Sequence, residues 1–171
     1  KIIRRLVKGQ RSQDFESFHT LRSALSWSPD GKHIAFVSKR KDRDVINIVN
    51  AENGKRLRRI SLRFDSVYYP AYSPEGGRLA FVGSDNGRPG VFVLDLGNEE
   101  VEALHIGALE YSGAAWSPDG NWLAFSCIAP GYVDSLDIFG RMGPLNRPDR
   151  DIYFVGVDDG VLTRLTWCRS E

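Results

Sequence analysis

The stretch SWSPDGKHIAF, residues 26–36, occurs three times in this chain with small changes. The second copy is AYSPEGGRLAF at residues 71–81, and the third is AWSPDGNWLAF at residues 115–125. Aligned on Ser28, Ser73 and Ser117, the copies start 45 and 44 residues apart. A period of this length with several short strands per period is typical of a β-propeller, in which each repeat forms one blade.

Each part of the repeated phrase has a structural explanation. The proline presets φ in the first turn position, the glycine accepts a positive φ, and the acidic residue can accept hydrogen bonds from turn amides. The acidic residues are Asp30, Glu75 and Asp119. We expect a large aromatic to pack between neighbouring blades, an alanine to allow close approach of the sheets, and a phenylalanine to fill the space between them. The aromatics are Trp27, Tyr72 and Trp116; the alanines Ala35, Ala80 and Ala124; the phenylalanines Phe36, Phe81 and Phe125. The phrase is therefore interpreted as scaffold rather than as a repeated binding site.

Short apolar runs bounded by turn residues follow each phrase and predict β-strands. The runs are 33–38, 78–83 and 122–127, then 45–51, 90–96 and 151–157, then 56–62, 101–107 and 161–167. With a short strand before each Ser-Pro, every repeat has four strands. The predicted fold is all-β: a partial β-propeller of three four-stranded blades, at about 22–63, 67–107 and 111–168, with no long helix. Residues 1–10 are interpreted as an orphan outer strand of a preceding blade, so that 1–171 is one domain.

The phrases LSWSPDGKHIAF, PAYSPEGGRLAF and AAWSPDGNWLAF, with the strand pair DIYFVGVDDGVLTRLT, resemble TolB-type, WD40-like propeller repeats over about residues 24–166. Such blades occur in periplasmic TolB proteins, in the propeller domains of prolyl oligopeptidase-like enzymes and in bacterial surface proteins. The resemblance implies a periplasmic or extracytoplasmic location and protein partners. It is specific for the blade and unspecific for function. The favoured function is a non-catalytic scaffold that binds proteins. The alternative is the substrate-gating propeller of a serine peptidase, and a surface-protein repeat is a third possibility.

Three blades leave two sheet faces without a neighbour, because closed propellers have four to eight blades. Large exposed apolar faces mark interaction sites, so we expect a protein partner, with a homodimer through the exposed blade faces as one form. Charge is uneven: residues 1–63 hold 16 Lys and Arg against 6 Asp and Glu, and the rest hold 7 against 16. This asymmetry suits a head-to-tail contact, but it equally suits solvated strand edges that carry Lys and Arg.

One loop breaks the period. Residues 128–150 separate two predicted strands, whereas the corresponding loops of the other repeats have fewer than ten residues. Long loops on rigid scaffolds often carry function, and this one mixes aromatics, Arg and Met with polar residues, as protein-binding surfaces do. The candidate contact residues are Tyr132, Asp134, Asp137, Phe139, Arg141, Met142, Arg147 and Arg150. The alternative is a decoration that covers a neighbouring blade.

Other classes of function find little support in the sequence. There is no GxSxG nucleophile motif, and 83–90, GSDNGRPG, is interpreted as a hairpin loop rather than a phosphate-binding loop. His19, His33 and His105 share no spacing, so no catalytic residue, cofactor or metal site is predicted. The basic runs lack interleaved aromatics, and no apolar run approaches a membrane span, so neither nucleic acid nor a membrane span is expected. No signal peptide is recognised in this chain. Cys127 is expected to be a small buried residue, and a disulfide with Cys168 is left open.

Overall fold

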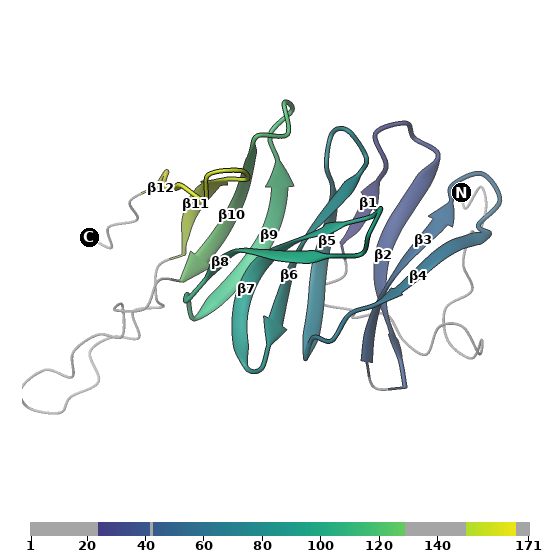
Figure 1. Ribbon diagram of the computed structural model, residues 1–171, viewed down its shortest axis with the longest axis horizontal. Helices are drawn as coiled ribbons and strands as arrows, with labels where there is room; N and C mark the ends of the chain where they lie inside the picture. The colour runs from purple at the N-terminus through teal and green to yellow at the C-terminus, as the bar shows by residue number, and fades with distance from the viewer. Residues whose placement is uncertain (1–23, 42, 129–149, 167–171) are drawn as a thin grey trace, which may run out of the picture.

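The structure is a computed structural model that describes residues 24–41, 43–128 and 150–166, and these residues form three antiparallel four-stranded sheets (Figure 1). The first sheet contains β1 (Leu25–Trp27), β2 (His33–Arg40), β3 (Arg43–Asn50) and β4 (Arg56–Ser61). The second contains β5 (Ser66–Tyr72), β6 (Arg78–Asp85), β7 (Arg88–Asp95) and β8 (Val101–Ile106). The third contains β9 (Glu110–Trp116), β10 (Trp122–Ile128), β11 (Asp151–Gly156) and β12 (Leu162–Arg164).

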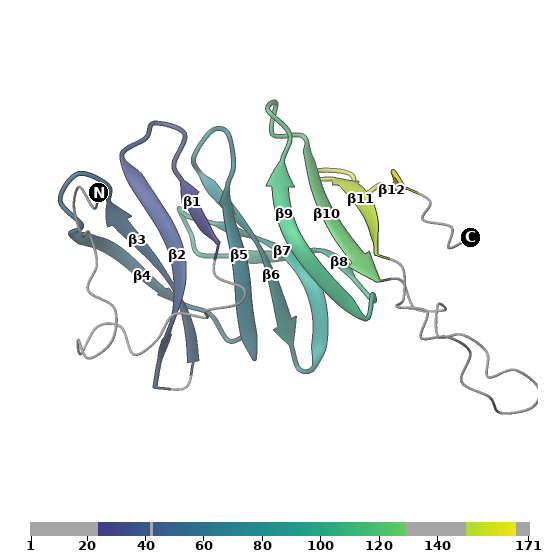
Figure 2. The ribbon, with the colours of Figure 1, turned by 180° about the vertical axis from the view of Figure 1, so that it is seen from behind.

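Within each sheet the strands pair in chain order, and the three sheets lie side by side as successive blades (Figures 1 and 2). The predicted fold class is therefore confirmed: the described residues form three propeller blades that do not close into a ring. The described part contains no helix long and apolar enough to cross a membrane. The N-terminal strand predicted at 1–10 lies outside the described residues.

The repeated turn has the predicted local structure. Gly31, Gly76 and Gly120 have φ values of +70°, +79° and +76°, which a residue with a side chain rarely adopts. Asp30 Oδ1 accepts the backbone N–H of Lys32 at 3.0 Å. The hairpin predicted at 83–90 is also confirmed, because Asp85 and Arg88 are joined by Asn86 and Gly87, both with positive φ. This pair of conformations gives the tight turn that suits the twist of paired strands.

The burial of the middle strands shows how the blades stack. In β6, the four consecutive residues 79–82 are buried, because this sheet is covered on both faces. Leu79 and Phe81 face the first sheet, whereas Ala80 and Val82 face the third. In β10, Leu123 and Phe125 are buried against the second sheet, but Trp122, which faces the other way, is 36% exposed.

Two apolar cores hold the three blades together. Junction 1 is the contact between the first and second sheets, and junction 2 is the contact between the second and third. Junction 1 buries Ala35, Val37, Ile46, Ile48, Ile60, Val67, Leu79, Phe81, Phe92 and Leu94. Junction 2 buries Ala80, Val82, Val91, Val93, Ala108, Tyr111, Leu123, Phe125, Cys127, Tyr153, Val155 and Val157. Cys127 is the small, buried residue that was predicted, and its thiol is free.

Candidate functional site

Of the eight candidate contact residues in the long loop, only Arg150 lies in the described part of the chain. Tyr132, Asp134, Asp137, Phe139, Arg141, Met142 and Arg147 lie outside it. Arg150 Nη2 lies 2.9 Å from Glu110 Oε2, so its guanidinium joins the end of the loop to the start of β9. Ile128 O, at the other end of the loop, accepts the backbone N–H of Leu109 at 2.8 Å.

A second ionic contact lies beside this one. The Asp151 side chain is buried and accepts hydrogen bonds from Arg164 Nη2 and from Thr166 Oγ1. A buried carboxylate is stable only when it is paired in this way. Arg150 at the end of the loop and Asp151 directly after it are therefore fixed to the third blade by directed contacts.

The residue at the aromatic position of the repeated phrase is hydrogen-bonded to the preceding blade in two repeats out of three. The Tyr72 backbone N–H donates to Ser26 Oγ at 2.9 Å, and Trp116 Nε1 donates to Ala71 O at 3.0 Å. Trp27 is 58% exposed, so the expectation that it packs between blades is wrong for this residue. It pairs with Ile34 on the face of the first sheet that points away from the second, and no described blade lies there.

Apolar side chains are also exposed at the far end of the row of blades. Trp122 is 36% and Ile152 42% exposed, and Trp122 meets Phe154 edge to face with ring centroids 5.1 Å apart. Ala124 shares this face and is only partly buried, whereas Ala35 and Ala80 are completely buried. Both end sheets of the described structure thus present apolar side chains to solvent.

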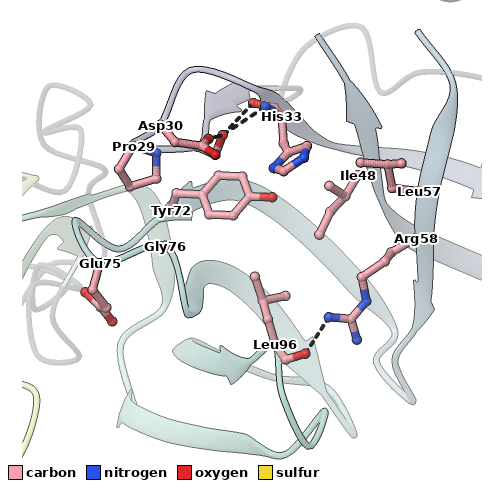
Figure 3. Close-up of a pocket in the computed structure, with 11 residues that line it drawn as sticks. Pro29, Asp30, His33, Ile48, Leu57, Arg58, Tyr72, Glu75, Gly76 and Leu96 are labelled. Carbon is pink, nitrogen blue, oxygen red and sulfur yellow. Dashed lines mark hydrogen bonds between the residues drawn. The ribbon is translucent and has the colours of Figure 1, made fainter. Parts of the chain in front are cut away.

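A hollow of about 450 Å³ opens at junction 1, beside the repeated turn of the first blade. Figure 3 shows the Tyr72 ring crossing it, with the hydroxyl pointing into the space between the His33 ring and Ile48. The first blade supplies Ser28, Pro29, Asp30, His33, Ile48, Leu57 and Arg58, and the second supplies Tyr72, Glu75, Gly76 and Leu96. The hollow therefore exists only where two blades meet.

The charged groups around the hollow are held by neighbours. Asp30 Oδ1 accepts from Ser28 Oγ at 2.6 Å and from the Lys32 amide, and these bonds lower the pKa of its carboxyl. Glu75 Oε1 accepts from Arg78 Nε at 2.8 Å. Arg58 donates to Leu96 O and pairs with Glu99 Oε1 at 2.6 Å.

Tyr72 behaves differently, because burial raises its pKa to about 12. Its hydroxyl is therefore protonated at neutral pH and can both donate and accept a hydrogen bond. Neither this hydroxyl nor the His33 ring is hydrogen-bonded within the described residues.

The sequence reasoning did not identify this hollow. The repeat position of His33 is occupied by Arg78 in the second copy, and the repeat position of Tyr72 is occupied by Trp116 in the third copy. The residues at these two positions thus differ between junction 1 and junction 2, and this difference is the signal in the sequence. Within residues 24–41, 43–128 and 150–166, no three His, Cys, Asp or Glu side chains gather where they could hold a metal ion.

Comparison with known proteins shows the same architecture in longer chains. The Tol-Pal system protein TolB of Alcanivorax borkumensis is 31% identical over 80 residues, which cover 46% of this chain and 18% of that protein. The structure of TolB from Acinetobacter baumannii aligns with a TM-score of 0.63 at 25% identity, covering 84% of this chain and 32% of that one. The chain thus spans at most about a third of these relatives.

The same fold occurs in a peptidase. An acylaminoacyl peptidase of Pyrococcus horikoshii aligns with a TM-score of 0.57 at 19% identity, covering 82% of this chain and 24% of that one. At this identity the likeness concerns the fold alone. The family model described as the TolB beta propeller domain matches residues 2–134, most of the chain. With three blades of that architecture in the described residues, this chain belongs to the TolB beta propeller domain family.

Proposed function

We propose that this chain is a non-catalytic, protein-binding part of a TolB-type propeller. The observation that carries the proposal is the exposure of apolar side chains on both end sheets, with Leu25 at 67%, Trp27 at 58% and Ile152 at 42%. Contiguous apolar patches on soluble proteins mark interaction sites. The family match and the TolB relatives support a scaffold role, and they support a periplasmic or extracytoplasmic location.

The long loop is the second part of this proposal. Its candidate contact residues, from Tyr132 to Arg150, mix aromatic, Arg and Met side chains of the kind that protein interfaces favour. The ion pair between Arg150 and Glu110 supports a firm attachment of the loop to the blade. We expect the double substitution of Phe139 and Arg141 by Ser to weaken binding of a protein partner without lowering the melting temperature.

A second copy of this chain is one partner that the end sheets suit. The described residues of the first blade, 24–61, hold nine Lys and Arg against three Asp and Glu, whereas those of the third, 110–128 and 150–166, hold two against five. Opposite net charges favour a head-to-tail encounter of the first blade of one copy with the third of another.

Light scattering of the 171-residue chain over a concentration series tests this form of the proposal. We expect the mass to rise toward twice that of one chain, and to fall back in a Trp27→Ser, Ile152→Ser double variant. Leu109→Ser is the matched control, because Leu109 is 54% exposed but lies in the connection between β8 and β9. The mass of one chain at every concentration would contradict pairing of copies.

The alternative function is the propeller domain of a serine peptidase. The fold likeness to the acylaminoacyl peptidase of Pyrococcus horikoshii supports it. The two proposals differ in what accompanies the blades in the full-length protein: the alternative requires a hydrolase domain with a GxSxG motif. Labelling of the full-length protein with a fluorophosphonate, which reacts with activated serines, is expected only under the alternative.

A further inference from the structure

The hollow at junction 1 lies beside two positions of the repeat whose side chains differ from those at junction 2. At junction 2, the Arg78 guanidinium lies 4.9 Å from the centre of the Trp116 ring, and Glu75 Oε1 accepts a hydrogen bond from Arg78 Nε. A hollow of about 510 Å³ lies beside Arg78 there, but it is lined mainly by polar and charged side chains of the second blade, among them Asp95, Glu100 and Glu102. At junction 1 the same positions hold His33 and Tyr72, which are shorter or smaller, and both line the hollow there.

The walls of this hollow are mainly apolar. Ile48 and Leu57 come from the first blade, and Leu96 and the ring of Tyr72 come from the second. Leu57 is 47% exposed, although it is a large aliphatic side chain in a strand. A group that covered Leu57 would remove apolar surface from water, which is worth about 25 cal/mol for each Å².

The polar groups of the hollow favour an uncharged ligand. Asp30 is engaged by Ser28 and Lys32, and Glu75 is engaged by Arg78. Arg58 is engaged by Leu96 O and Glu99. A charged ligand would therefore meet groups whose charges are already partly balanced by their neighbours. The Tyr72 hydroxyl and the His33 ring form no hydrogen bond within the described residues, so both can bond a ligand.

We propose that the hollow at junction 1 binds an apolar side chain of a protein partner, with the adjoining peptide amide bonded by the Tyr72 hydroxyl or the His33 ring. The volume of about 450 Å³ lies within the usual range for ligand sites. Apolar walls with a few convergent polar groups are the usual composition of such sites. Large apolar side chains seated in pockets supply much of the binding energy at protein interfaces. The inference rests on the proposed protein-binding function and assigns one contact to it.

The direct test is an NMR titration of the ¹⁵N-labelled chain with N-acetyl-leucine-N-methylamide, an uncharged side chain with its two flanking amides. We expect saturable shifts of backbone amides that line the hollow, those of Tyr72, Gly76 and Leu96. N-acetylglutamate-N-methylamide and N-acetyllysine-N-methylamide are expected to bind at least about threefold more weakly, because the charges of the hollow are already paired.

Two variants locate the binding within the hollow. Tyr72→Phe keeps the ring and removes the hydroxyl, and we expect affinity to fall about two- to tenfold, the value of one net hydrogen bond. His33→Arg places a longer, charged side chain in the mainly apolar hollow, and we expect it to abolish binding while the chain stays folded. The matched control is Leu109→Arg, which adds the same charge at an exposed residue outside both the hollow and the end sheets, and it is expected to leave binding unchanged.

The inference is overturned if the leucine probe causes no saturable shift at these amides, if His33→Arg binds it like the native chain, or if a charged probe binds best. None of these results bears on the end sheets, since Trp27 and Ile152 lie outside the hollow. The light-scattering experiment tests those surfaces independently. Failure of this inference and failure of the proposed function are thus distinguishable.

Discussion

The two junctions between blades are built from the same repeat, yet different side chains lie beside the repeated turn at each of them. At junction 2 Arg78 lies over the Trp116 ring, whereas the same positions of junction 1 hold His33 and Tyr72, which line the hollow there. The turn glycines and the buried phenylalanines are the same in both. The repeated residues thus determine the scaffold, whereas the positions of His33 and Tyr72 vary between repeats. A binding site can arise at such variable positions without loss of the fold.

The apolar cores of the two junctions differ as well. Junction 1 contains a cluster of three phenylalanines: Phe81 stacks on Phe92 with ring centroids 5.5 Å apart, and Phe64 meets Phe92 edge to face at 4.7 Å. Junction 2 uses polar aromatics, since the Tyr111 hydroxyl lies 2.6 Å from His105 Nδ1. The phenylalanine cluster of junction 1 contains no polar atom, whereas the aromatic contact of junction 2 includes a hydrogen bond that responds to protonation.

The largest effect is expected from Phe81→Ala. Phe81 is completely buried in the central sheet, which is covered on both faces, so the surroundings cannot collapse into the cavity. We expect a loss of about 3–5 kcal/mol of unfolding free energy, the range for a buried aromatic cut to alanine. Urea denaturation followed by tryptophan fluorescence measures it.

Phe125→Ala, at the same repeat position in the third blade, sharpens this comparison. Phe125 is also buried, but its sheet has one exposed face, so its strand can move inward and reduce the cavity. We expect the loss to be about 1 kcal/mol smaller than for Phe81→Ala, because cavity size sets much of the cost. Equal losses would mean that the end sheet is as rigid as the central one.

A smaller effect is expected from Trp116→Ala, with Trp27→Ala as its internal control. Trp116 is partly buried, donates to Ala71 O and lies under Arg78, so its removal should cost about 3 kcal/mol. Trp27 occupies the same repeat position but is 58% exposed, and its removal should cost at most about 0.5 kcal/mol. Similar losses for the two would show that Trp27 is buried in solution by a partner or a further copy.

The contrast between Trp27 and Trp116 also shows how far the sequence predicts this structure. Strands, turns and blade order follow from local patterns, and the structure confirms them. The burial of a repeated residue depends instead on whether another blade lies beside it. The repeated phrase alone does not indicate which sheet faces have a neighbouring blade. The hollow at junction 1 was missed for a related reason: it depends on two side chains, His33 and Tyr72, that are 39 positions apart in the sequence and meet only when the blades stack.

The smallest effect is expected from pH, and it arises at junction 2. Ala108 donates its backbone N–H to the Tyr111 oxygen at 3.0 Å, and burial raises the pKa of Tyr111 to about 12, so the hydroxyl is protonated and can donate to an unprotonated His105 Nδ1. Burial lowers the pKa of His105 below its ordinary value of 6.5, in agreement with this arrangement.

The sign of the pH effect follows from proton binding. As the pH falls below about 6.5, the unfolded chain protonates His105 before the folded chain does, so the unfolded state binds more protons and the folded state loses stability. The contribution is complete above about pH 6.5 and disappears as the pH falls to the lowered pKa of the folded state. The melting temperature of the native chain should therefore drop more between about pH 7 and 5 than that of His105→Gln, which has no titrating ring. Parallel curves for the two proteins would show that His105 is protonated equally in both states, and that the polar core of junction 2 is as indifferent to pH as the phenylalanine core of junction 1.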